Sequence, residues 1–178
     1  MSAHLRLFLV TVIAGAAVAG CSSGGAGKDP AVARATATPD ASTEAGRDIE
    51  CTQREAHVLT TFAPAANDLV VGSISWPGLL GWASTDPAAP DGNHKIGAVV
   101  KAGKVVTVSV ADGTAGLSYG QGWGYSPAPA VTFHACADAD TAFIGGFHVP
   151  ERRCVPLVIT EDGMPPARIT VSFFAGAC

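Results

Sequence analysis

The residues with the clearest chemical potential are Gly116-Leu117-Ser118-Tyr119-Gly120, whose spacing matches the G-x-S-x-G nucleophile turn of α/β-hydrolases. Asp138 or Asp140, followed by His148, would complete the Ser…Asp…His order of that fold. The turn requires a helix after the serine, whereas the glycine-rich stretch after Ser118 disfavours one. A small serine hydrolase using Ser118 is therefore the alternative hypothesis, and a non-enzymatic function is the favoured one.

Metal chemistry has weaker support in the sequence. The chain contains no H-x-H, no H-E-x-x-H and no paired C-x-x-C spacing. His134 and His148 could ligate copper or zinc together if their strands pair. A single histidine on a strand is more often a half-exposed polar residue. The sequence therefore predicts neither a metal site nor a cofactor.

The aromatic residues of segment 117–125 form the best candidate binding surface. Tyr119, Trp123 and Tyr125 are interleaved there with glycine, which lets the backbone approach a ligand closely. Flat aromatic faces stack on sugar rings or anchor protein interfaces. The alternative is that these rings fold back as a lid over the core.

Four of the five cysteines are expected to form disulfides. Cys51, Cys136, Cys154 and Cys178 allow three pairings outside the cytoplasm. Cys51 opens the folded region and Cys178 ends it, so the preferred pairing is Cys51–Cys178 with Cys136–Cys154. The two other pairings stay open. The fifth cysteine, Cys21, lies in a different context.

From about residue 50 the apolar residues follow a period of two, which is typical of strands. Val106, Val108 and Val110 share one face of a strand, while Thr107 and Ser109 share the other. The predicted strands cover residues 69–76, 94–101, 104–111, 131–136, 141–149, 154–160 and 168–174.

These short strands, separated by turn signals such as Asp112-Gly113 and Asp162-Gly163, predict an all-β fold. We expect an antiparallel two-sheet sandwich of the immunoglobulin-like kind over residues 50–178. A jelly roll or a partly closed barrel is the alternative. Residues 52–62 are compatible with a short helix or with a first strand.

Composition excludes several classes of protein. Apolar residues make up 48% of the chain, too many for a disordered protein, and 21 Gly with 12 Pro are too many for a helical bundle. The 11 Lys and Arg are spread thinly and the net charge is −4, so no nucleic-acid partner is expected.

The amino terminus has the features of an export signal. Residues 7–19 are apolar and follow Arg6, and a helix of this length rises only about 20 Å, too short to span a bilayer. The segment ends in Val18-Ala19-Gly20-Cys21, which resembles the lipobox of bacterial lipoproteins. In that family the cysteine thiol takes a diacylglyceryl group and the chain is cut just before it. An ordinary secretory signal is the alternative.

Residues 22–49 are rich in Gly, Ala, Thr, Pro and Ser and contain no aromatic residue, which predicts a flexible tether of about 30 Å. The expected organisation is a signal peptide (1–20), a lipidated Cys21 with its tether (21–49) and a sandwich domain (50–178). Acylated Cys21 would hold the protein on the extracytoplasmic face of the cell membrane.

Four segments carry a further resemblance: Asp68–Trp76 with Pro77-Gly78-Leu79, Phe143-Ile144-Gly145-Gly146-Phe147, Cys154-Val155-Pro156-Leu157 and Phe173-Phe174-Ala175-Gly176-Ala177-Cys178. They resemble a group of uncharacterised exported proteins of actinobacteria, over most of residues 60–178. The resemblance implies an envelope location and carries no known activity, so it supplies no catalytic residues. A cell-wall glycan or an envelope protein is the expected partner.

Overall fold

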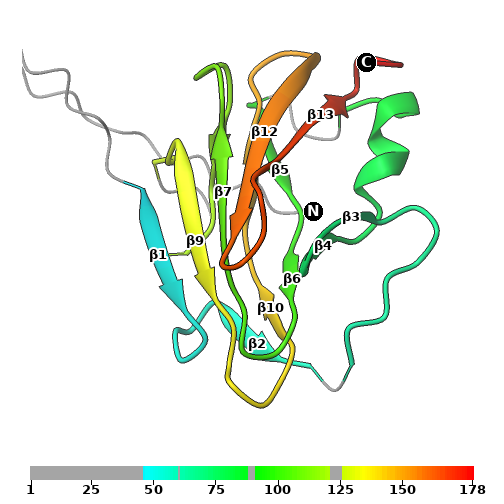
Figure 1. The fold of residues 1–178 in the computed structure, drawn as a ribbon. Helices are drawn as coiled ribbons and strands as arrows, with labels where there is room; N and C mark the ends of the chain where they lie inside the picture. Colours follow the sequence, from blue (N-terminus) through cyan, green and yellow to red (C-terminus); the bar gives the residue numbers. More distant parts are fainter. Residues whose placement is uncertain (1–45, 60, 88–90, 121–125) are drawn as a thin grey trace, which may run out of the picture. The chain divides into compact units, whose positions relative to one another are not determined.

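The computed structural model describes residues 46–59, 61–87, 91–120 and 126–178 (Figure 1). All described residues belong to one compact unit. The predicted signal peptide, Cys21 and nearly all of the predicted tether lie outside the described residues. Within the described ranges no helix is long and apolar enough to cross a membrane.

The first sheet contains five strands in the order β1-β9-β7-β12-β13 (Figure 1). These are β1 (Arg47–Glu50), β9 (Ala130–His134), β7 (Val105–Val110), β12 (Arg153–Glu161) and β13 (Ala167–Phe173). β1 runs parallel to β9, and the other neighbours are antiparallel.

The second layer combines a five-stranded and a three-stranded sheet. The larger has the order β2-β10-β6-β4-β3, with β2 (Ala56–Val58), β10 (Thr141–Phe143), β6 (Ala98–Val100), β4 (Ile74–Trp76) and β3 (Leu69–Val71). The smaller has the order β5-β11-β8, with β5 (Asn93–Lys95), β11 (Gly146–His148) and β8 (Gly116–Leu117). β5 leads into β6 and β10 leads into β11, so the smaller sheet extends the larger one.

The strand pairing is that of an immunoglobulin-like sandwich. Such a fold pairs strand B with E in one sheet and C with F and F with G in the other. Here β4, β6 and β10 take the places of A, B and E, while β7, β9, β12 and β13 take those of C, C′, F and G. The prediction of an all-β, two-sheet sandwich is confirmed.

The core lies between the two layers. Along β7, Val106, Val108 and Val110 are buried while Thr107 and Ser109 are only partly covered, as the alternation predicts. Aromatic rings meet from opposite layers: Phe133 and Phe143 have centroids 5.1 Å apart, and Phe147 and Phe173 have centroids 5.0 Å apart. Burying each such ring contributes about 1.5–3 kcal/mol to folding.

The structure decides the conformation of two segments, residues 52–62 and residues 69–76. Residues 52–62 contain strand β2, not a helix. Residues 69–76 are not one strand but the hairpin β3–β4, which turns at Gly72, where φ is 56°. Glu161 holds this turn, because its carboxylate accepts hydrogen bonds from the Ser73 N–H (3.1 Å) and hydroxyl (2.9 Å).

The four cysteines are disulfide-bonded as predicted, but the preferred pairing is wrong. The bonds are Cys51–Cys136 and Cys154–Cys178. Cys51 follows β1 and meets Cys136 because β1 pairs in parallel with β9, with a Cα–Cα distance of 5.2 Å. Cys178 returns to Cys154 because the residues after β13 turn back beside the start of β12. One bond therefore closes the β1–β9 edge, and the other fastens the C-terminal segment.

A short 3-10 helix follows β4 and packs against the other layer. Residues Leu79–Ser84 form the 3-10 helix η1, preceded by Gly78 in the left-handed region at φ 75°. The Asp68 carboxylate accepts hydrogen bonds from the backbone N–H groups of Gly78 (2.8 Å) and Ala65 (2.8 Å). This arrangement directs η1 across the end of β13, against which it packs.

Candidate functional site

The residues of the G-x-S-x-G hypothesis are not brought together as a catalytic triad. Ser118 lies beside Gly146, and its hydroxyl is buried with no hydrogen-bond partner among the described residues. Asp140 precedes β10, six residues along the chain from Gly146, which corresponds to about 15–20 Å. Its carboxylate accepts a hydrogen bond from the Ala102 N–H (2.8 Å). The Ser…Asp…His order in the sequence is therefore not accompanied by the geometry of a catalytic triad.

The other two members of that hypothesis have different surroundings. His148 Nδ1 lies 3.0 Å from the side-chain oxygen of Asn93, and His148 pairs with Gly116 across β11 and β8. Asp138 lies exposed in the β9–β10 connection, close to Cys136. Neither contacts the Ser118 hydroxyl, which has no partner in the described part of the chain.

Tyr119 belongs to the core, so of the two interpretations of this ring the one that folds it back over the core holds, and display at the surface does not. Its side chain is fully buried, its hydroxyl donates to the Ile96 carbonyl (2.8 Å), and it accepts from Trp76 Nε1 (3.1 Å). Burial raises the pKa of the hydroxyl. The ring fits because Gly145 has no side chain: a Cβ there would lie 2.4 Å from it.

The rest of the predicted aromatic surface cannot be compared in the same way. Trp123 and Tyr125 lie outside the described residues. The residues on either side of them are held by one side chain: Arg47 donates to the carbonyl oxygens of Tyr119 (2.6 Å) and Ser126 (2.7 Å). Through Arg47, β1 therefore holds the backbone at Tyr119 and at Ser126.

The two strand histidines do not meet. His134 on β9 donates from Nε2 to Asp48 on β1 (3.1 Å), with Glu50 at 3.8 Å, whereas His148 lies in the other layer on β11. Within the described ranges, no group of three or more His, Cys, Asp or Glu residues is placed to hold a metal ion.

The candidate site is instead a cleft that joins three distant parts of the chain. Its walls come from η1 and the residues after it, from β5, and from the turn after β13. The cleft has a volume of about 450 Å³, within the usual range for ligand sites. It is lined by Trp82, Thr85, Asp86, Asn93, His94, Lys95 and Phe174.

An aromatic cluster forms the apolar end of this cleft. The rings of Trp82 and Phe174 are stacked, with centroids 5.4 Å apart and planes 16° from parallel. His94 packs against both, at 4.7 Å from Phe174 and 5.9 Å from Trp82. Phe173, one residue before Phe174, meets Trp82 edge-on at 5.9 Å from inside the sandwich. The partly exposed Trp82 ring is therefore held in one orientation.

Phe174 owes its position to an unusual backbone conformation. Its φ of 61° is the only positive value at a non-glycine residue in the described ranges. A bulky residue there stores about 1–3 kcal/mol of strain, which the surrounding contacts must offset. Those contacts are the Trp82 stack, the hydrogen bond from the Gly176 N–H to the Ala83 carbonyl (2.9 Å) and the Cys154–Cys178 disulfide.

Burial favours the uncharged form of His94. Burial lowers the pKa of its imidazole below 6.5, although the hydrogen bond from Nε2 to the Val149 carbonyl (3.3 Å) acts in the opposite direction. Asp91 favours the charged form of the ring and His148 disfavours it. The aromatic end of the cleft is therefore neutral.

The polar end adjoins a second hollow of about 580 Å³, which shares Thr85, Asp86 and Phe174 with the first. Arg152 and Asp86 form an ion pair here, with side chains that are 56% and 85% exposed. Both groups can therefore reach a ligand. The continuous hollow, called the aromatic cleft below, has a ring-lined end and a hydrogen-bonding end.

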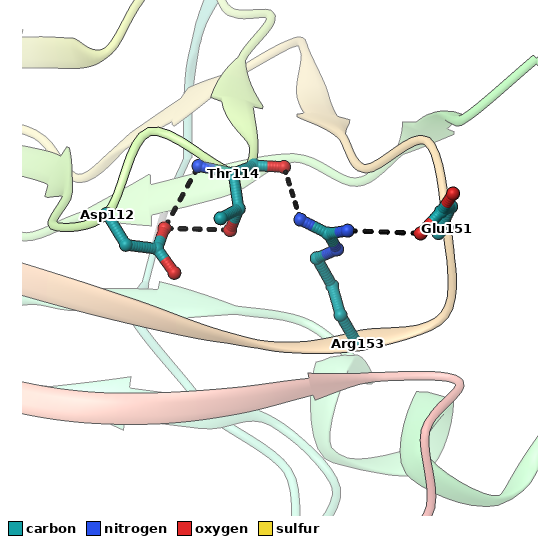
Figure 2. Close-up of polar contacts among 4 residues, drawn as sticks. All are labelled: Asp112, Thr114, Glu151 and Arg153. Carbon is teal, nitrogen blue, oxygen red and sulfur yellow. Dashed lines mark hydrogen bonds and ion pairs between the residues drawn. The ribbon is translucent and has the colours of Figure 1, made fainter.

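A polar network outside the cleft fixes the segment that carries Arg152 (Figure 2). Arg153 donates to the Thr114 carbonyl (3.1 Å) and to the Glu151 carboxylate (3.2 Å). Asp112 accepts from the N–H (3.0 Å) and hydroxyl (2.7 Å) of Thr114, and these bonds lower the pKa of the Asp112 carboxyl. Because Glu151 and Arg153 flank Arg152, the network restricts the backbone from which Arg152 extends.

One feature of the sequence indicates the aromatic cleft, although the alternation of strand residues does not account for it. Phe173 and Phe174 are consecutive, so a period of two cannot place both rings in the core. Trp82 lies among small residues in η1 with no periodic context. Their meeting depends on the path of the chain after β13, which no local pattern reports.

Comparison with known proteins adds no family or relative. No protein-family model matches this chain, and a search of curated proteins finds no match.

Proposed function

We propose that this chain is a lipid-anchored, extracytoplasmic binding protein without catalytic activity. The Val18-Ala19-Gly20-Cys21 motif after an apolar segment supports lipidation of Cys21. The two disulfides support an oxidising compartment. The resemblance to exported actinobacterial proteins supports a place in the cell envelope, where a cell-wall glycan or an envelope protein would be the ligand.

The aromatic cleft is the observation that supports a binding role best. It combines a rigid, partly exposed Trp82 ring with the exposed Asp86–Arg152 pair, and rigid rings beside adaptable polar groups are typical of ligand sites. The strain at Phe174 adds to this, because backbone strain gathers at functional sites.

Anchoring is tested by Cys21→Ser in cells fed an alkyne-labelled fatty acid. We expect the variant to lose the label and either to keep its signal peptide uncleaved or to leave the membrane fraction. The matched control Ser22→Ala should keep the label, the mature size and the membrane location. A Cys21→Ser protein that stays membrane-bound at its mature size contradicts the anchor.

Binding is tested by retention of the lipidated protein on purified cell envelope. We expect Trp82→Ala to weaken retention about ten-fold, as loss of a stacking ring would. Leu80→Ala is the matched control, because Leu80 lies exposed on the same short helix and does not line the aromatic cleft. Retention that is unchanged in Trp82→Ala, with the fold intact by circular dichroism, rules out this cleft as the binding site.

A further inference from the structure

The polar end of the aromatic cleft has a distinctive hydrogen-bonding capacity. Arg152 can only donate and Asp86 can only accept, and the two side chains lie against each other in solvent. A hydroxyl group donates and accepts at once, so it can bond to both without separating them. A charged ligand group would have to displace one partner from the other.

The charges around the cleft also disfavour a strongly charged ligand. His94 is neutral, and the Asp86–Arg152 pair is balanced, which leaves Lys95 at the exposed rim. Asn93 adds a neutral amide at the same wall. These groups suit a neutral ligand that carries several hydroxyls.

The aromatic end requires an apolar face on the same ligand. Trp82 stacks on Phe174 and contacts His94 edge-on. The orientation of its exposed ring surface is therefore fixed before a ligand binds. An entirely apolar ligand would cover Asp86, Arg152 and Lys95 without offering them hydrogen bonds, which is costly. A pyranose ring has C–H faces for the aromatic end and equatorial hydroxyls for the polar end.

A peptide that adds a strand to β5 is the competing occupant. β5 is the outer strand of its sheet, and Gly92 and Ile96 bond towards β11, so the backbone groups of Asn93 and Lys95 point to the unpaired side of β5. The Asn93 N–H is already bonded to the Asp91 carboxylate (3.1 Å). A peptide strand would therefore find only a short row of backbone partners, too few for the main-chain pairing on which such recognition depends.

From these contacts we infer that the aromatic cleft binds a neutral saccharide, with a sugar ring on Trp82 and its hydroxyls shared between Asp86 and Arg152. This inference rests on the proposed binding function and names its ligand class. The volume of the cleft is enough for a short oligosaccharide.

The experiment separates the ligand class from the binding function. Purified cell envelope is divided into a polysaccharide fraction, freed of peptide by exhaustive digestion, and a fraction of released peptides. Binding of each fraction to the full lipidated protein in detergent micelles is measured by titration calorimetry. The variants are Trp82→Ala, Trp82→Phe, Arg152→Gln and the control Leu80→Ala.

We expect the polysaccharide fraction to bind, about ten-fold more weakly to Trp82→Ala and several-fold more weakly to Arg152→Gln. Trp82→Phe should recover part of the affinity, and Leu80→Ala should leave it unchanged. Because Arg152 is exposed, Arg152→Gln keeps the test valid even where Trp82→Ala fails to fold.

Other results overturn the inference in distinguishable ways. Binding of the peptide fraction alone, with the same dependence on Trp82, overturns the saccharide and leaves the binding function in place. Polysaccharide binding that none of the cleft variants changes overturns this cleft as the sugar site. Absence of binding by both fractions and by intact envelope overturns the proposed function itself.

Discussion

Two aromatic clusters of this sandwich contain similar side chains, but one is enclosed in the core and the other borders a cleft. Around Tyr119 the rings are enclosed: its hydroxyl is bonded to Ile96 and Trp76, and Phe133 packs edge-on at 5.1 Å. Around Trp82 the neighbouring rings are buried as well, but Trp82 itself stays partly exposed at a cleft. The difference lies in the polar groups beside the rings, which are satisfied internally in the first cluster and exposed in the second.

The backbone decides which cluster is closed. Gly145 leaves the space that the Tyr119 ring fills, so that ring enters the core. A positive φ at Phe174 turns the chain out of β13, so that its ring, itself buried, stacks on the partly exposed Trp82. An aromatic residue next to glycine is thus not by itself a sign of display, and the enclosed cluster should determine stability while the open one determines binding.

The largest expected effect distinguishes the two disulfides. Removing Cys51–Cys136, which spans 85 residues, should cost about 4–5 kcal/mol in free energy of unfolding, and removing Cys154–Cys178, which spans 24, about 3 kcal/mol. Only the second bond anchors the segment that carries Phe174, so only its loss should weaken envelope retention. Urea unfolding and retention of the two double serine variants measure this. If both double serine variants lost retention equally at a temperature where both are folded, the link between the Cys154–Cys178 bond and binding would be contradicted.

Truncating each central ring tests the contrast directly. Tyr119→Ala should cost about 3–5 kcal/mol, because it empties a fully buried site. Trp82→Ala should cost about 1–2 kcal/mol, because that ring is only partly buried. Tyr119→Phe should cost about 1–3 kcal/mol, since Trp76 Nε1 and the Ile96 carbonyl lose their partner. Chemical denaturation gives all three values, and a Trp82→Ala loss as large as that of Tyr119→Ala would make Trp82 a core residue.

The same contrast applies to carboxylates. Glu161 is 6% exposed and accepts from Ser73 and from Lys104 (3.0 Å), so Glu161→Gln should cost about 1–3 kcal/mol. Asp86 is 85% exposed, so Asp86→Asn should leave the free energy of unfolding unchanged and lower saccharide affinity instead. The pair of variants is compared by urea unfolding at pH 7. A stable Glu161→Gln protein would show that the β3–β4 turn does not depend on this side chain.

The smallest expected effect is the pH dependence due to His94. Its pKa is lowered in the folded state by burial, so below pH 6.5 the unfolded chain binds more protons and the free energy of unfolding decreases as the pH falls. Denaturation between pH 7.5 and 5 should show this decrease, and His94→Gln should reduce it. The pKa of the Glu161 carboxyl is lowered overall: burial raises it, but the hydrogen bonds from Lys104 and Ser73 lower it by more. Its protonation therefore affects the free energy of unfolding only below about pH 4.5. A profile identical in the two proteins would mean that His94 is not buried in solution.

Local properties of the chain were enough to predict the sandwich. The alternation along β7, β9 and β13 selects a buried and an exposed face, and the turn signals at Gly113 and Gly163 coincide with positive φ. These features depend on neighbouring residues only. The hairpin at Gly72 was missed because its two strands are too short to show a period of their own.

Cysteine content predicted two disulfides, while their pairing required the sheet. Cys51 and Cys136 are joined because β1 pairs in parallel with β9, a partner that no pattern within β1 specifies. Likewise, the strands and turns around each ring decide that Tyr119 is enclosed and that Trp82, stacked on the buried Phe174, stays partly exposed. A period of two fixes the face on which a side chain lies. Strand partners, by contrast, are chosen by packing between residues far apart in the chain, because only a complete core offsets the entropy of ordering them.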